Sequence, residues 1–150
     1  VVARGQRNDA LVTFELPSLS GESQIELPGR LRWGPFAVGD LLLLSTTPGD
    51  LQAFAKDGRL LWSAAIDGKL PVGKPALNEQ VLAVAMSDGT VLRWSVDDGE
   101  LVSRIDVGQP LADGPLLIGR HITVRAADGT ILQVANEVNN NSAPQTSGAE

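Results

Sequence analysis

Residues 75–107 read PALNEQVLAVAMSDGTVLRWSVDDGELVSRIDV, four apolar runs of which the last three are separated by Asp-Gly pairs. The runs are PAL at 75–77, VLAVAM at 81–86, TVLRWSV at 90–96 and ELVSRIDV at 100–107. Asp-Gly between apolar runs favours a hairpin, because Gly tolerates a positive φ and Asp hydrogen-bonds its own backbone. No run shows sustained helical periodicity. The stretch therefore predicts four short antiparallel strands.

The same pattern recurs along the chain with a period of 40 residues. Pro35, Pro75 and Pro115 lie 40 positions apart. Three apolar ladders share this phase: Phe14, Phe54, Trp94 and Val134; Leu11, Leu51, Val91 and Ile131; and Val2, Leu42, Leu82 and Ile122. A fixed period of about 40 residues marks a repeat protein.

Four antiparallel strands in a unit of about 40 residues are typical of a β-propeller blade. With the strands of a blade labelled a to d, the chain reads b-c-d, a-b-c-d, a-b-c-d, a-b-c. We therefore predict an all-β fold, an incomplete arc of 3–4 propeller blades. Each proline is expected to open strand a. Strands b and c should lie nearest the core, and the outer strand d should be more exposed.

The repeat phase sets the expected domain organisation. Residues 1–135 form the propeller segment, with blades at about 1–29 (partial), 30–69, 70–109 and 110–135 (partial). Residues 136–150 are polar and are expected to form a disordered tail, so we interpret the sequon at 140–142 as a chance match. The pattern is already under way at Val1, which indicates a fragment or a processed product. The arc belongs to a larger propeller, pairs with another chain or stays open, and the open array is the least favoured because it exposes strand edges.

Composition narrows the classes of function. The net charge of −6 argues against a nucleic-acid partner. No segment approaches the roughly 20 apolar residues of a membrane span. The chain has no Cys, so neither a disulfide framework nor a thiolate metal site is available.

The turn between the third and fourth strands carries a family signature. The stretch AFAKDGRLLW at 53–62 resembles the repeat of the PQQ-like (quinoprotein or BamB-like) β-propeller family. In that family an Ala, a turn Gly and a Trp four residues later dock adjacent blades. The resemblance assigns this docking role to Ala53, Gly58 and Trp62. The next repeat departs from the pattern, with Arg93 in place of the Ala and Ser103 in place of the Trp.

The resemblance also bears on activity and location. It implies an extracytoplasmic, periplasmic or secreted protein. The quinoprotein dehydrogenases of the family resemble one another in an adjacent Cys pair and a calcium site, and this chain has no Cys. Large inserted loops for a cofactor chamber are also absent. We therefore expect no cofactor, metal or catalytic residue here, while part of a PQQ-dependent dehydrogenase stays open as an alternative.

Two polar groups are candidates for a chemical site. Asp97 and Asp98 form a carboxylate pair, but calcium needs several converging oxygens, and a hairpin turn explains the pair better. His121 is the only His. No partner acid or nucleophile is suggested near it, so we interpret His121 as a partly exposed strand residue. No nucleophile elbow, P-loop or zinc-ligand spacing occurs.

The residues before the three prolines are expected to form one rim of the propeller. Trp33, Lys74 and Asp113 lie near these prolines, in loops that we expect to enter strand a. Variable loop residues often bind partners, and an exposed Trp33 would suit an interface anchor. Packing of Trp33 across a blade junction is the favoured alternative. Trp62 and Trp94 are interpreted as a docking residue and a core residue.

The function that best fits these features is a non-catalytic scaffold segment for protein–protein interaction. Its expected partners are another protein or the remaining blades of a larger propeller, and self-association is a further option. A ligand-sensing ectodomain of a signalling protein is the third alternative.

Overall fold

The computed structural model describes residues 2–4, 9–15, 17–18, 20–47, 49–119 and 121–134. These ranges contain 14 β-strands, and no residue in them is helical. The predicted all-β fold is confirmed. Within the described ranges there is accordingly no helix that could cross a membrane. The expected tail at 136–150 lies outside the described residues.

The strands form four antiparallel sheets in chain order. The first sheet contains β1 (Val2–Arg4), β2 (Asp9–Glu15) and β3 (Ser20–Glu26), and the second contains β4 (Leu31–Val38), β5 (Leu41–Thr46), β6 (Asp50–Ala55) and β7 (Leu60–Ala65). The third contains β8 (Pro71–Asn78), β9 (Val81–Met86), β10 (Thr90–Ser95) and β11 (Leu101–Asp106), and the fourth contains β12 (Leu111–Ile118), β13 (His121–Ala126) and β14 (Ile131–Val134). The described residues thus give the predicted series of three, four, four and three strands.

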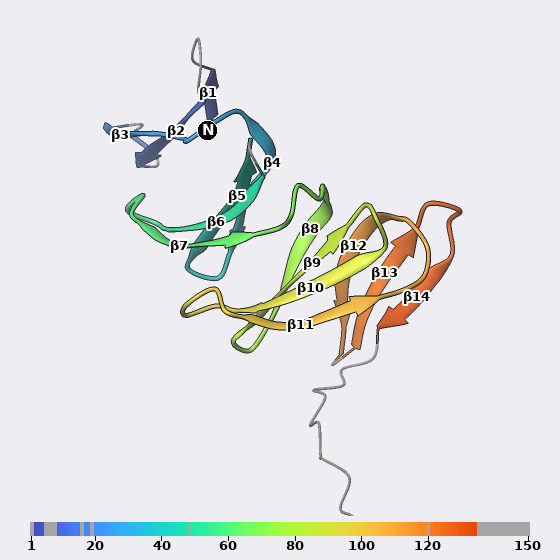
Figure 1. Ribbon diagram of the computed structural model, residues 1–150. Coiled ribbons are helices and arrows are strands. Elements are labelled where there is room, and N and C mark those ends of the chain that lie inside the picture. Colours follow the sequence, from blue (N-terminus) through green and yellow to red (C-terminus); the bar gives the residue numbers. More distant parts are fainter. Residues whose placement is uncertain are drawn as a thin grey trace, which may run out of the picture.

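The four sheets follow one another around an arc that does not close (Figure 1). The first strand of each later sheet lies on the inside, since β8 contacts both β4 and β12. β7 and β11 are the opposite, outer edges of the second and third sheets. This arrangement is that of consecutive propeller blades, and the predicted incomplete arc is confirmed.

The junctions between sheets hold the core. Leu11 and Phe54 belong to the first junction, between the first and second sheets. Leu51 and Trp94 belong to the second junction, and Val91 and Ile122 to the third. Fully burying one such aliphatic side chain stabilises the fold by about 1.5–3 kcal/mol.

Burial follows the strand order within a sheet. The second and third strands of the two complete sheets are buried along most of their length. Their side chains alternate between two junctions, because neighbouring residues of a strand point to opposite faces. The outer strands β7 and β11 are mostly exposed. The predicted order of burial is confirmed.

The prediction that each proline of the ladder opens an inner strand is wrong. β4 begins at Leu31, β8 at Pro71 and β12 at Leu111, each four residues before the proline of the ladder. Each inner strand pairs with only one neighbour in its sheet, so a proline that lacks an N–H is tolerated there. The pairing register shifts on the approach to each proline or across it. Each of these prolines therefore sits inside a strand at a β-bulge.

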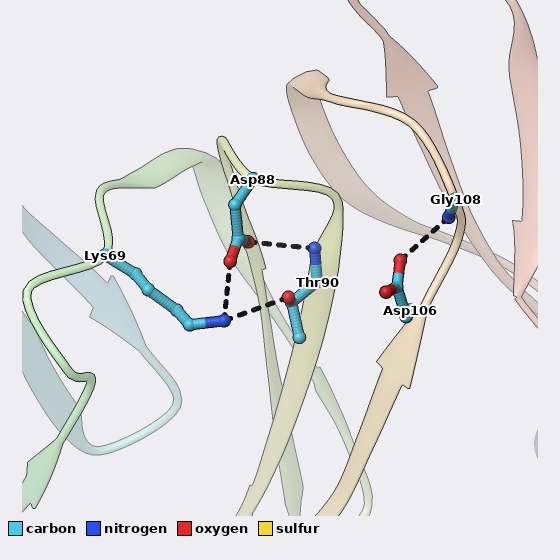
Figure 2. Close-up of polar contacts among 5 residues, drawn as sticks. All are labelled: Lys69, Asp88, Thr90, Asp106 and Gly108. Carbon is cyan, nitrogen blue, oxygen red and sulfur yellow. Dashed lines mark hydrogen bonds and ion pairs between the residues drawn. The ribbon is translucent and has the colours of Figure 1, made fainter.

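The Asp-Gly turns are closed by the aspartate side chains. Asp88 Oδ1 accepts a hydrogen bond from Thr90 N at 3.0 Å (Figure 2). Asp98 does the same with Glu100 N at 3.0 Å, which places the Asp97–Asp98 pair in a turn. Lys69, from the connection between β7 and β8, donates to Asp88 Oδ2 at 2.5 Å and to Thr90 Oγ1 at 3.1 Å. This contact ties the connection between the second and third sheets to a turn of the third.

The Lys69 contact predicts an acid-sensitive contribution to stability. Burial raises the pKa of Asp88, but hydrogen bonds from Lys69 and Thr90 and the charge of Lys69 lower it by more, so the pKa lies below its ordinary 3.8. A carboxyl group whose pKa is lowered by folding stabilises the fold at pH values above its ordinary pKa. This contribution is lost as the pH falls through the pKa of the folded state. Asp88 is 42% exposed, and solvent weakens an exposed ion pair. We therefore expect Asp88→Asn to lower the free energy of unfolding by about 0.5–1 kcal/mol at pH 7.

The measurement is urea unfolding of wild type and Asp88→Asn between pH 7 and pH 3. The difference between them should shrink as pH falls below 3.8, because Asp88 then takes up a proton in the unfolded chain first and in the folded protein only at lower pH. Asp98→Asn is the matched control, since Asp98 makes the same turn bond but no ion pair with a described residue. An Asp88→Asn cost that stays constant across this pH range would contradict the assignment.

Candidate functional site

Three bulges on neighbouring inner strands form the candidate site. They contain Trp33-Gly34-Pro35 on β4, Gly73-Lys74-Pro75 on β8 and Asp113-Gly114-Pro115 on β12. The sequence prediction placed these residues in loops before strand a. That placement is wrong, because each inner strand begins earlier and continues through its bulge. Bulges often lie next to functional sites, where they redirect side chains.

The three bulges touch one another in series. Trp33 Nε1 donates a hydrogen bond to Gly73 O at 2.8 Å. Gly73 has a φ of +64° and lies directly against the next bulge, where a Cβ on Gly73 would come within 2.5 Å of Gly114 N. Asp113 Oδ1 accepts a hydrogen bond from Gly114 N at 2.8 Å. Only a residue without a side chain fits at position 73.

A groove of about 740 Å³ opens along these bulges. Its lining comes from the inner strands β4, β8 and β12 and from β13 and β14 of the last sheet. The lining residues are Trp33, Phe36, Gly73, Lys74, Asp113, Gly114, Pro115, Leu116, Thr123, Val124, Arg125 and Ile131. The three predicted rim residues, Trp33, Lys74 and Asp113, therefore line one groove.

The groove is apolar with a charged margin. Trp33 and Phe36 pack together with ring centroids 4.8 Å apart. Leu116 and Ile131 are 61% and 63% exposed, which is unusual for large aliphatic residues. Within the described ranges, Lys74 is exposed and has no carboxylate within ion-pair distance.

Two findings qualify the predicted rim. Trp33 is only 8% exposed, and its indole N–H is engaged by Gly73. Trp33 therefore packs across the junction between the second and third sheets, which was the favoured of the two interpretations, and it is not an exposed anchor. Asp113 Oδ2 lies 3.8 Å from Arg125 Nη2. An exposed pair of this kind contributes little to stability, so both groups stay available to a ligand.

The described residues that line the groove include no Cys, His or Ser. His121, exposed on β13, lies outside the lining, and its Nδ1 is 2.8 Å from Gln133 Nε2. Among the described residues, no group of three or more His, Asp or Glu side chains is placed to hold a metal ion. The lining residues that are present, apolar side chains beside Lys74, Asp113 and Arg125, are suited to contact an apolar and charged surface.

The predicted docking residues lie at two different junctions. Trp62 is 7% exposed, and its Nε1 donates to Val96 O at 2.8 Å. Its indole lies against Gly99 of the third sheet, where a Cβ would come within 2.6 Å of the ring. Ala53 is the strand partner of Trp62.

Gly58 lies at the first junction, between the first and second sheets. A Cβ on Gly58 would collide with Ile25 Cδ1 of the first sheet. Each docking side chain thus meets the turn glycine of the following sheet, and not the glycine of its own repeat. The sequence prediction named Ala53, Gly58 and Trp62 but did not identify Gly99 as the glycine that Trp62 contacts.

Sequence reasoning also missed several residues of the groove, among them Phe36, Leu116 and Arg125. Phe36 and Leu116 follow Pro35 and Pro115 directly and share one phase of the repeat. That phase could have identified them as a pair on the same face of the inner strands. Arg125 carried no signal of this kind.

Comparison with known proteins identifies the class as a β-propeller built from PQQ-like repeats. The family described as outer membrane protein assembly factor BamB matches residues 17–104 and 47–140, which together include more than half of the chain. The chain belongs to this BamB-like repeat family. No curated protein matches the chain.

Three solved structures show the same fold. The crystal structure of BamB from Moraxella catarrhalis is 15% identical, with a TM-score of 0.67, and the match covers 89% of this chain and 44% of BamB. The computationally designed Ika4 protein is 14% identical, with a TM-score of 0.62 and coverage of 89% and 88%. The designed Ika8 protein is 14% identical, with a TM-score of 0.58 and coverage of 87% and 43%. The chain thus spans less than half of the BamB structure.

Proposed function

We propose that this chain is a non-catalytic propeller segment that binds a partner protein through the groove of the inner-strand bulges. The observation that carries the proposal is the groove itself, with its aromatic pair, its exposed Leu116 and Ile131, and Lys74, which forms no ion pair with a described residue. Exposed large apolar side chains grouped beside a charged rim are typical of protein-interaction sites. The description of the family as an outer membrane assembly factor supports this function and an extracytoplasmic location.

The groove chemistry defines the partner segment. Leu116 and Ile131 favour an apolar side chain, since covering them removes aliphatic surface from water. Lys74 favours a carboxylate next to that side chain, because no described carboxylate neutralises it. We therefore propose an extended partner segment that carries an apolar residue beside an acidic one. No described contact favours the dehydrogenase or the sensor alternative.

Peptides selected from a random displayed library on the full chain test this function. Their affinities are then measured by isothermal titration calorimetry against wild type, Lys74→Glu and Leu116→Asp. We expect each variant to weaken binding at least tenfold, which corresponds to about 1.4 kcal/mol.

Leu101→Asp is the matched control, because Leu101 is 52% exposed but lies on the outer strand β11. This variant should bind the selected peptides like wild type. Selected peptides that bind Lys74→Glu and Leu116→Asp as tightly as wild type would show that the groove is not the binding surface.

A further inference from the structure

One row of side chains across the third sheet differs in size and chemistry from its counterpart in the second sheet. In the second sheet the row is Leu43 on β5, Ala53 on β6 and Trp62 on β7. In the third sheet the corresponding row is Ala83 on β9, Arg93 on β10 and Ser103 on β11. A small residue between two large ones is thus replaced by a guanidinium between two small residues.

The row of Arg93 faces the third junction, between the third and fourth sheets. Ala83 pairs with Arg93 and belongs to the core of this junction. Residues paired across neighbouring strands lie on the same face of a sheet, so Arg93 and Ser103 also face this junction. The side chains that form its core are all apolar. The guanidinium is therefore placed in an apolar junction.

Both polar side chains of the row are buried without a hydrogen-bond partner in the described part of the chain. Arg93 is 6% exposed, and its Nε and Nη1 have no acceptor. The Ser103 Oγ is buried and unpaired as well. Among the described residues, no carboxylate lies within ion-pair distance of Arg93. A guanidinium only donates hydrogen bonds and a hydroxyl can donate one, so this pair of side chains suits an anion.

Charge and size define the anion. An uncompensated buried charge is strongly destabilising, and one guanidinium balances one negative charge. A divalent anion would leave a net negative charge among apolar side chains, which is costly. Ala83 and Ser103 have shorter side chains than Leu43 and Trp62, and they leave more space beside the central residue of the row. These features favour a small monovalent anion.

We propose that Arg93 and Ser103 form a binding site for a chloride ion at the third junction. The bound ion neutralises the guanidinium, accepts hydrogen bonds from both side chains and stabilises the contact between the third and fourth sheets. Neither residue lines the groove of the inner-strand bulges. The site is therefore independent of the proposed partner binding.

Thermal unfolding of the full chain tests the site, with chloride raised from about 1 to about 200 mM in place of gluconate at constant ionic strength. Gluconate is monovalent but far larger than chloride. We expect the Tm of wild type to rise by about 3 °C or more, because an ion that binds only the folded protein stabilises it. The Tm of Arg93→Leu should change by less than about 1 °C, since this variant lacks the charge that holds the ion.

Arg104→Leu is the matched control, because Arg104 is the exposed neighbour of Ser103 on β11. It removes the same charge as Arg93→Leu but should keep the rise in Tm that wild type shows. A wild-type Tm that does not depend on chloride would mean that water satisfies the buried donors, and it would overturn the proposal. An equal rise in Arg93→Leu and wild type would overturn it as well.

If Arg93→Leu does not fold, the chloride NMR signal in the presence of wild type and of Ser103→Ala decides the question. Exchange of chloride with a protein site broadens this signal. Ser103→Ala lacks one of the donors, so we expect it to reduce the broadening about twofold or more. Equal broadening by the two proteins would overturn the proposal.

Discussion

Replacing Trp62 by alanine is expected to lower the free energy of unfolding by about 3–5 kcal/mol. Trp62 is buried between the second and third sheets, with its indole against Gly99. The substitution removes this contact and leaves a cavity, because Gly99 has no side chain to fill it. It also leaves Val96 O without its donor, which adds to the loss.

Urea unfolding of Trp62→Ala and Trp62→Phe separates the two contributions. Phenylalanine keeps much of the packing but has no N–H, so we expect a smaller loss of about 1–3 kcal/mol. Leu61→Ala is the control, because Leu61 is the neighbouring residue on β7 and is 38% exposed. A loss for Trp62→Ala no larger than that of Leu61→Ala would refute its docking role.

Replacing Gly73 by alanine is expected to lower the free energy of unfolding by about 3 kcal/mol or more and to disrupt the groove. Part of the cost is conformational, since a residue with a side chain at a φ of +64° loses roughly 1 kcal/mol. The larger part is steric, because the new Cβ would lie 2.5 Å from Gly114 N and 2.6 Å from Gly114 O. These are backbone atoms, so β8 and β12 must separate. Trp33 would then lose its acceptor at Gly73 O.

Gly108→Ala is a closely matched control for this prediction. Gly108 has a φ of +77°, but no atom lies within 4 Å of the place where its Cβ would stand. It should therefore lose only the conformational part, about 1 kcal/mol. Urea unfolding gives the two costs, and titration with the selected peptides shows whether Gly73→Ala alone weakens groove binding. Equal costs at the two positions would mean that the inner bulges are not in close contact.

The number, order and turns of the strands could be predicted from the sequence because they depend on local chemistry. A side chain on a strand alternates between faces, and an Asp-Gly pair closes a turn within a few residues. Asp88 and Thr90 show how short the range is, since their bond joins residues two apart. The period of 40 residues then repeats the same strands and turns along the chain.

The starts of the inner strands could not be predicted in the same way. The residues before Pro35 do not alternate clearly, and a proline usually argues against the interior of a strand. Whether the strand continues depends on the register of β5, which pairs with β4 on both sides of the bulge. The prediction therefore places Trp33 in a loop before the strand, whereas the structure places it within β4, with its indole N–H bonded to Gly73 O.

The sequence by itself thus determined that the chain is built from propeller repeats, and it marked Trp62, Lys74 and Asp113 as positions of interest. Only the tertiary structure decided which residues meet across a junction. Trp33 and Gly73 are 40 residues apart, and Trp62 and Val96 are 34 apart. Such contacts depend on how one sheet is placed against the next, and no local pattern records that placement. The groove exists because the arc brings three inner bulges side by side.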